Sequence, residues 1–197
     1  MNTSGIKHTC RFVAQFLSRP AMTGAVMPSS TALARTIVEG LELERARAVL
    51  EYGPGTGAFT ERILEKLPRE SKFLAIEANP RLAAIFKSRQ PQVPLVQDSV
   101  ANVRTICDYA GIDRVDCIVS GLPWAAFPAA MQVKFLDEMM RVLARNGRFA
   151  TFAYLHGLLL PPGKRFARLL PKYFGSVSKS RVVWRNLPPA LVYRCRR

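Results

Sequence analysis

Hydrophobic residues follow two different periods along this chain. Short runs of mostly consecutive apolar residues, the pattern of strands covered on both faces, occupy residues 48–50, 72–77, 93–99, 115–120 and 148–155. Between them, apolar residues recur every three or four positions, which indicates amphipathic helices over residues 32–38, 59–67, 100–109 and 129–144, with a further helix starting near Pro80. The regular alternation of strands and helices predicts an α/β protein with a mostly parallel sheet and helices on both faces.

The end of the chain changes this pattern. A basic helix is predicted over residues 164–172, and two strands over 177–184 and 190–195 face each other across Asn186-Leu-Pro-Pro. Asn146-Gly147 predicts a turn before the strand that starts at Arg148. The two late strands predict an antiparallel hairpin at the edge of the sheet.

The first residues predict a helix with two unlike sides. Over residues 6–19, one line is polar and the opposite arc is apolar. The polar line carries Lys7, Arg11, Gln15 and Ser18, and the apolar arc carries Ile6, Cys10, Phe12, Val13, Phe16 and Leu17. Such a helix either lies in a membrane interface or covers the core with a solvated polar side.

A turn-rich connector separates this helix from the rest of the chain. Ser29, Ser30 or Thr31 can cap the helix predicted over 32–38. We therefore divide the chain into a helix and connector over residues 1–31, acting as a membrane or substrate lid, and one further domain over residues 32–197.

The composition fits a globular protein with a polyanionic partner. Of 197 residues, 49% are hydrophobic, and 29 Lys and Arg against 14 Asp and Glu give a net charge of +15. Such a charge favours nucleic acid or an anionic membrane surface. The four cysteines, at positions 10, 107, 117 and 195, have neither C-x-x-C spacing nor a histidine at zinc-ligand spacing, so we expect free thiols and no metal.

No part of the sequence predicts export or a membrane span. The first ten residues contain no apolar signal-peptide core. The longest apolar stretch, residues 149–160, is too short to cross a bilayer and contains His156. We expect a cytoplasmic protein, monomeric, that binds peripherally to the inner face of the cell membrane.

The first strand runs directly into a glycine-rich turn. Residues 49–57 read V-L-E-Y-G-P-G-T-G, and the helix at 59–67 follows at once. Glycine permits positive φ and lets a ligand approach the backbone without a Cβ in the way, so this corner predicts a nucleotide-binding site. The dinucleotide pattern G-x-G-x-x-G/A fits less well than acidic-x-G-x-G-x-G, in which Glu51 precedes the first glycine by two residues.

This acidic form resembles motif I of class I S-adenosylmethionine (SAM) methyltransferases. T-G-A-V-x-P-S-S at residues 23–30 and S-G-L-P at 120–123 resemble the bacterial phospholipid N-methyltransferases, which convert phosphatidylethanolamine towards phosphatidylcholine and have relatives that act on ornithine lipids. The resemblance covers nearly the whole chain. It implies SAM as cofactor and the class I fold, a Rossmann-like seven-stranded, mostly parallel sheet whose last strand is antiparallel.

The resemblance also assigns the glycine turn to the cofactor. Gly53, Gly55 and Gly57 would let SAM approach the backbone, and Glu51 would organise the loop and the cationic methionine end. The alternative is a glycine turn that only packs within an α/β protein.

Two acidic residues that follow later strands are expected at the same cofactor. Glu77 lies 24 positions after Gly53 (77 − 53), near the ~20-residue offset of a ribose-binding carboxylate, and its ionised oxygens can accept both ribose hydroxyl protons. Asp98 falls where class I methyltransferases often hold the adenine amino group. Asp98-Ser99 also predicts a helix cap, so this assignment is open.

The fourth strand runs into S-G-L-P-W at residues 120–124. Ribosomal RNA adenine dimethylases have N-[LI]-P-[YF] here, with an asparagine that accepts protons from the base amine and an aromatic residue that stacks on the base. Gly121 stands in the asparagine's place, which argues against an adenine substrate. By the resemblance, Gly121 borders the cofactor and Leu122, Pro123 and Trp124 border the substrate, with ordinary packing as the alternative for Trp124.

Tyr154 and His156 follow the fifth strand and are the predicted catalytic residues. A headgroup ammonium, with a pKa near ~10, must lose a proton before its nitrogen can accept a methyl group. These side chains would orient the amine or pass its proton to water, and a packed tyrosine with a structural histidine is the alternative.

The sequence therefore predicts an N-methyltransferase that acts on a membrane aminolipid, phosphatidylethanolamine or its methylated intermediates. Its rivals are an ornithine-lipid N-methyltransferase, a ribosomal RNA adenine methyltransferase and a SAM-binding module without activity. A dehydrogenase is the weakest rival, because no residues are left for a substrate domain.

Overall fold

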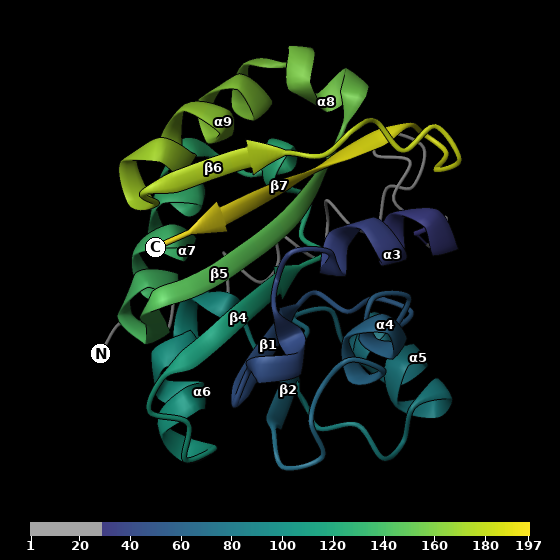
Figure 1. The fold of residues 1–197 in the computed structure, drawn as a ribbon, viewed down its shortest axis with the longest axis vertical. Helices are drawn as coiled ribbons and strands as arrows, with labels where there is room; N and C mark the ends of the chain where they lie inside the picture. The colour runs from purple at the N-terminus through teal and green to yellow at the C-terminus, as the bar shows by residue number, and fades with distance from the viewer. Residues whose placement is uncertain (1–28) are drawn as a thin grey trace.

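A seven-stranded sheet runs through residues 29–197, the part of the chain that this computed structural model describes (Figure 1). The strand order is β3-β2-β1-β4-β5-β7-β6. β7 is antiparallel to β5 and β6, and the other neighbours are parallel. The strands are β1 (Ala48–Tyr52), β2 (Lys72–Ile76), β3 (Leu95–Val96), β4 (Val115–Ser120), β5 (Leu143–Tyr154), β6 (Ser176–Lys179) and β7 (Ala190–Arg196). This arrangement confirms the predicted fold class.

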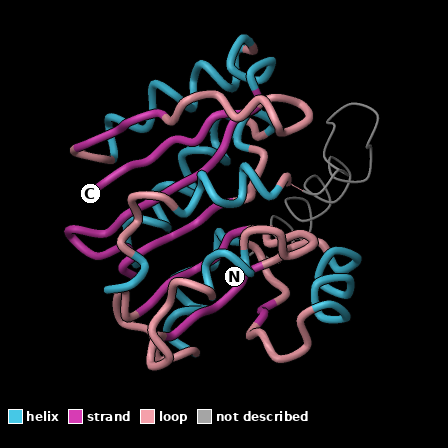
Figure 2. The backbone as a smooth tube through the Cα atoms, turned by 45° about the vertical axis from the view of Figure 1, so that its right-hand side comes forward, coloured by secondary structure: helices cyan, strands magenta, loops and turns pink. Residues whose placement is uncertain are grey.

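Helices cover both faces of the sheet (Figure 2). One face packs against α3 (Thr31–Val38), α4 (Thr60–Leu64) and α5 (Pro80–Arg89), and the other against α6 (Val103–Tyr109), α7 (Ala129–Val142) and α9 (Pro161–Tyr173). A short helix, α8 (Leu155–Leu159), follows β5 directly. Three-residue 3-10 turns lie at η1 (Leu43–Arg45), η2 (Val100–Asn102) and η3 (Trp124–Ala126).

The central strand β1 is buried along its whole length. Val49 belongs to the core under α3 and α4, whereas Leu50 and Tyr52 belong to the core under α6 and α7. Cover on both faces explains why its apolar residues are consecutive and not alternating. Each buried aliphatic side chain contributes about 1.5–3 kcal/mol, so the core fixes the position from which the glycine turn starts.

Side-chain caps start two helices at the predicted residues. Ser30 accepts a hydrogen bond from the Leu33 N–H at 3.1 Å and is therefore the cap of α3 among the three candidates. Asn79 accepts from the Arg81 N–H at 2.9 Å and starts α5 at Pro80. Each such cap contributes about 1 kcal/mol.

Two arginines tie the end of the chain to earlier helices. Arg194 on β7 donates to the Thr36 carbonyl at 2.7 Å and the Glu39 carbonyl at 2.8 Å, and it pairs with the Glu39 carboxylate at 2.9 Å. Arg197 donates to the Met140 carbonyl of α7 at 2.8 Å. These bonds satisfy carbonyls that helix ends leave without a partner and fix β7 between the two layers.

The structure corrects several predicted boundaries. α4 ends at Leu64, β3 is limited to Leu95–Val96, and η2 occupies the first turn of the helix predicted over 100–109. The predicted turn at Asn146-Gly147 is wrong, because both residues lie inside β5, where the pairing with β4 shifts its register. Main-chain pairing with a central neighbour outweighs the local turn preference and absorbs the extra residues as an irregularity.

The edge hairpin is shorter than predicted. β6 ends at Lys179, and beyond it only an isolated bridge joins Val183 to Ala190. The helix predicted over residues 6–19, and with it most of the proposed 1–31 segment, lies outside the described residues. Within residues 29–197, no helix is both long enough and apolar enough to cross a membrane.

Candidate active site

The sheet reverses its strand order between β1 and β4, and the predicted site segments gather there. The chain runs outward from β1 through β2 to β3, then returns to β4 on the other side of β1. Ligands of open α/β sheets usually bind outside the carboxyl ends of the strands at such a reversal. The Gly121 N–H donates to the Tyr52 carbonyl at 2.7 Å, and the Gly53 N–H donates to the Ile76 carbonyl at 2.8 Å. The loops after β1, β2 and β4 are therefore joined at this point.

The glycine loop needs its glycines for two different reasons. All three have positive φ, +66° at Gly53, +56° at Gly55 and +88° at Gly57, a region that other residues rarely adopt. A Cβ at Gly53 would lie 2.7 Å from the Leu122 side chain, and one at Gly57 would lie 2.6 Å from the Gln90 side chain. A Cβ at Gly55 would meet no atom within 4 Å. The backbone at Gly55 therefore faces open space that a ligand can reach.

Glu51 places a buried carboxyl directly behind this loop. Its Oε2 accepts a hydrogen bond from the Thr60 hydroxyl at 2.6 Å, whereas Oε1 has no partner among the described residues. Burial raises the pKa of Glu51 to about 8, the Thr60 hydrogen bond opposes this rise, and the charge of Glu77 adds to it. A buried carboxyl oxygen without a partner fits a cationic or hydrogen-bond-donating ligand at the loop.

Glu77 connects the end of β2 to the same loop. It is 4% exposed, and it accepts hydrogen bonds from the Asn79 N–H at 2.9 Å and the Gly55 N–H at 3.4 Å. Burial raises the pKa of Glu77, and the hydrogen bonds from backbone N–H groups oppose that rise. The carboxylate thus lies at the Gly55 N–H, in the loop where the sequence predicts a ribose-binding acceptor.

The helix cap predicted from Asp98-Ser99 is Ser99, whose hydroxyl accepts from the Ala101 N–H at 3.2 Å, and Asp98 stabilises this cap. Its Oδ1 accepts from the Ser99 N–H at 2.6 Å and from the Asn102 side-chain amide at 2.9 Å. These bonds hold the start of η2. They engage one carboxylate oxygen, so the cap and a contact with adenine are compatible.

Gly121 has no room for a side chain. A Cβ there would lie 2.5 Å from the Gly53 carbonyl oxygen, a backbone atom of the glycine loop. The asparagine of the adenine dimethylase motif would force the loops after β1 and β4 apart. Ser120 braces the same segment, since its hydroxyl accepts from the Leu122 N–H at 3.3 Å and the Trp124 indole N–H at 3.0 Å.

Trp124 lies inside the core. Its side chain is 2% exposed and stacks on Phe166 with ring centroids 4.6 Å apart. Its other aromatic neighbours are Phe127, Phe135 and Phe149. This placement favours the packing interpretation of Trp124, whereas Leu122, against Gly53, lies at the loop itself.

Tyr154 and His156 stand at the carboxyl end of β5 with their rings stacked, centroids 5.6 Å apart and 9° from parallel. The ring of Tyr154 also packs edge-on against Phe152, with centroids 5.2 Å apart, and Phe152 packs in the same way against Phe59, with centroids 5.8 Å apart. Phe59 directly precedes α4 at the glycine loop, so a row of aromatic rings connects that loop to His156. Phe59 and Phe152 were not among the residues predicted for the site, although the spacing of Phe152 and Tyr154 puts them on one face of a strand.

Comparison with known proteins identifies this arrangement. A family model described as a methyltransferase domain matches residues 49–147. An ornithine lipid N-methyltransferase of Singulisphaera acidiphila is 30% identical over 190 residues, which cover 94% of each chain. The chain belongs to the methyltransferase domain family. It is a SAM-dependent methyltransferase, and the predicted enzyme class and cofactor are confirmed.

Other methyltransferases resemble this one in part of the sequence or in fold. A ribosomal RNA small subunit methyltransferase A of Prosthecochloris aestuarii is 38% identical over 69 residues, 35% of this chain and 25% of that protein. The O-methyltransferase from Bacillus cereus in complex with SAH has a TM-score of 0.69 at 13% identity, covering 95% of this chain and 91% of that one. TomG from Streptomyces achromogenes, in complex with SAM, has a TM-score of 0.66 at 14% identity, covering 99% and 91%. These two structures support the class I fold.

Proposed function

We propose that this methyltransferase transfers methyl groups to the amine of an aminolipid headgroup, and that its substrate is an ornithine lipid. The similarity to the ornithine lipid N-methyltransferase carries this proposal, because it extends over 94% of both chains. That similarity favours ornithine lipid over the phosphatidylethanolamine expected from the sequence.

The geometry at Gly121 supports a lipid amine over an RNA base. The asparagine acceptor of the adenine dimethylase motif is absent, and the Gly53 carbonyl occupies the space that its Cβ would need. The similarity to RNA adenine methyltransferases covers 35% of this chain in one relative and 58% in another, against 94% for the ornithine lipid enzyme. Once it has lost a proton, the nitrogen of an aliphatic amine is the strongest nucleophile of the headgroup. Such a substrate therefore needs fewer orienting contacts from the enzyme than a flipped base.

The proposed cofactor contacts follow the chemistry of each described group. The unpartnered oxygen of Glu51 would balance the cationic methionine end, Gly55 would let the ligand approach the backbone, and Glu77 would accept the ribose hydroxyls. Asp98 would receive the adenine amino group on its second oxygen. Bound SAM supplies an electrophilic methyl group on a positively charged sulfur.

Tyr154 and His156 are proposed to handle the substrate amine. Stacking on His156 and contact with Phe152 hold the Tyr154 ring at the end of β5. From there the phenol would orient the nitrogen by a hydrogen bond, and the exposed imidazole would pass the proton of the ammonium to water. Orientation of two reactants can supply about 7–11 kcal/mol of the barrier, so positioning accounts for most of the proposed catalysis.

Mass spectrometry of lipids tests this proposal. The gene would be expressed in a bacterial host that makes both ornithine lipid and phosphatidylethanolamine but methylates neither. We expect ornithine lipids heavier by one or more CH2 units, and unchanged phosphatidylethanolamine. Methylated phosphatidylethanolamine alone would restore the first expectation from the sequence, and unmodified lipids with methylated adenine in ribosomal RNA would overturn the lipid proposal.

A further inference from the structure

The connection between β6 and β7 exposes large apolar side chains. Trp184 is 72% exposed and Leu187 is 68% exposed. On the neighbouring helix α8, Leu159 is 73% exposed. Among the described residues, only Tyr109, at 90%, is another large apolar or aromatic side chain exposed to this degree. Isolated exposed residues are ordinary, but three at one end of the molecule indicate an interaction surface.

Hydrogen bonds of the buried Asn186 fix the conformation of residues 181–187, which we name the tip. Asn186 is 2% exposed; its side chain accepts from the Ser30 N–H at 2.9 Å and donates to the Pro188 carbonyl at 2.7 Å. The Asn186 N–H donates to the Val183 carbonyl at 3.2 Å. Because Asn186 is buried between Trp184 and Leu187, the tip presents both side chains outward with little loss of conformational freedom on binding.

The tip lies at the substrate end of the sheet. The Leu155 N–H donates to the Pro189 carbonyl at 3.0 Å, and Tyr154 pairs with Ala190. The residues that follow the tip therefore contact the strand end that carries the proposed catalytic residues. A surface bound by the tip would be close to the reaction.

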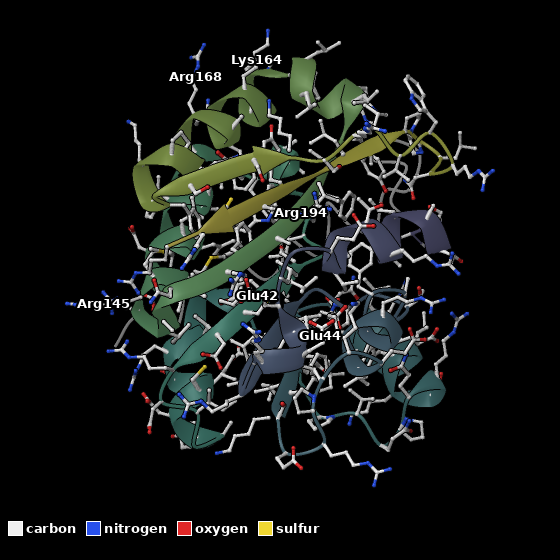
Figure 3. All side chains as sticks on the ribbon, viewed as in Figure 1. Glu42, Glu44, Arg145, Lys164, Arg168 and Arg194 are labelled. Carbon is white, nitrogen blue, oxygen red and sulfur yellow. The ribbon has the colours of Figure 1, made fainter. Side chains whose placement is uncertain are left out.

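Charge in this part of the chain has one sign. All 14 Asp and Glu residues lie at or before Glu138, whereas residues 139–197 contain 13 of the 29 Lys and Arg residues. Figure 3 shows Lys164 and Arg168 on α9 pointing away from the protein, while Arg194 points towards α3. Arg181 and Arg185 are in the tip and line a cavity of about 670 Å³ beside it.

We infer that the tip inserts Trp184 and Leu187 into the interface of an anionic phospholipid bilayer, with Arg181 and Arg185 against lipid phosphates. This inference rests on the proposed action on a lipid headgroup. Tryptophan is enriched at the level of lipid headgroups, and each basic residue near an anionic surface contributes about 1 kcal/mol. Leu187 distinguishes this partner from RNA, since an aliphatic side chain gains from acyl chains but neither stacks on bases nor binds phosphate.

Tryptophan fluorescence of the full-length protein tests the insertion. The chain has two tryptophans, Trp184, exposed, and Trp124, 2% exposed. Vesicles of phosphatidylcholine with about one third phosphatidylglycerol should shift the emission to the blue, and brominated acyl chains should quench it. The Trp184→Phe variant, which keeps only Trp124, should lose both responses.

Matched variants separate the tip from other membrane contacts. In sedimentation with the same vesicles, Trp184→Ala or Leu187→Ala should weaken binding about tenfold, because each removes an inserted side chain. Tyr109→Ala, which truncates the most exposed aromatic residue at the amino end of β4, should change binding less than about twofold. Thermal unfolding would verify that all three variants fold.

The outcomes distinguish this inference from the proposed function. Ornithine-lipid methylation with no change in Trp184 emission on vesicles would overturn the inference that the tip inserts, and would leave the proposed function intact. Insertion of Trp184 without methylation of any lipid would leave the tip standing and overturn the function. Equal loss of binding in the tip variants and in Tyr109→Ala, or quenching of Trp184 by RNA but not by brominated lipid, would also contradict the inference.

Discussion

The two halves of the sheet differ in the side chains that they bury and expose. The first half is formed by β1, β2 and β3, and the second by β5, β7 and β6. In the first half, the carboxyls of Glu51 and Glu77 are buried beside a loop of positive-φ glycines. In the second half, residues 139–197 contain no Asp or Glu, and Trp184 and Leu187 are exposed. The first half has the features of a site for a small cationic ligand, and the second has those of a surface for a large anionic partner.

The sequence relatives differ in how much of this chain they match. The alignment with the ribosomal RNA methyltransferase of Prosthecochloris aestuarii covers about a third of this chain, whereas the alignment with the ornithine lipid N-methyltransferase covers nearly all of it. The fold is common to enzymes with different substrates, since the O-methyltransferases with TM-scores of 0.69 and 0.66 are only 13% and 14% identical. Substrate choice must therefore come from residues beyond the shared fold.

The largest expected effect lies in the first half, at Glu51. Its carboxyl has a pKa of about 8, against the usual 4.5. Between these values the folded protein keeps a proton that the unfolded chain has lost, so the stability provided by protonated Glu51 is lost as the pH rises towards 8. Urea unfolding should show the free energy of unfolding falling by about 5 kcal/mol over this range, and Glu51→Gln should remove most of the fall. Equal pH dependence in both proteins would contradict the assignment.

The same carboxyl predicts that SAM binds more tightly at higher pH. A cation beside Glu51 favours the carboxylate, so binding below a pH of about 8 should release a proton. Calorimetry in two buffers with different ionisation enthalpies would measure this release. Glu51→Gln, which has no proton to lose, should bind SAM with the same apparent enthalpy in both buffers.

These two predictions depend on features that the sequence indicated only in part. Consecutive apolar residues and alternating glycines were enough to predict β1, its loop and Glu51, because both patterns are local. The burial of Trp124 and the aromatic row from Phe59 to His156 depend on contacts between distant segments, which periodicity does not contain. Asn146-Gly147 shows the converse, since a local turn signal was outweighed by pairing with β4.

Substituting two glycines separates packing from ligand approach within the first half. Gly121→Ala should lower the free energy of unfolding by about 1–3 kcal/mol, because its Cβ would lie 2.5 Å from the Gly53 carbonyl. Gly55→Ala should lower the free energy of unfolding by about 1 kcal/mol, because the alanine must adopt a positive φ. It should greatly weaken SAM binding, because its Cβ would enter the open space that SAM is proposed to occupy. Normal SAM affinity in a folded Gly55→Ala variant would contradict the proposal that the cofactor binds at this loop.

Glu77 tests the ribose contact. Glu77→Ala should weaken SAM binding by about 1–3 kcal/mol, since two ribose hydroxyls would lose their acceptor. Glu77→Gln keeps one acceptor oxygen and should lose less. Unchanged affinity by calorimetry in the alanine variant would refute the assignment.

The smallest effect is expected in the second half, at Tyr154, the last residue of β5. Tyr154→Phe removes one hydrogen bond to the amine and keeps the stack on His156, so kcat/KM for the lipid should fall about tenfold or less. SAM affinity should not change. A loss of SAM affinity would instead show that the aromatic row supports the cofactor loop.

Methyl transfer from labelled SAM by the purified protein is the most direct test of a lipid amine as substrate. One reaction would contain anionic vesicles with ornithine lipid, a second the same vesicles with phosphatidylethanolamine, and a third ribosomal RNA without vesicles. We expect label in ornithine lipid, in amounts that fall as salt screens the contact with the vesicles. Label in RNA and none in either lipid would contradict the account.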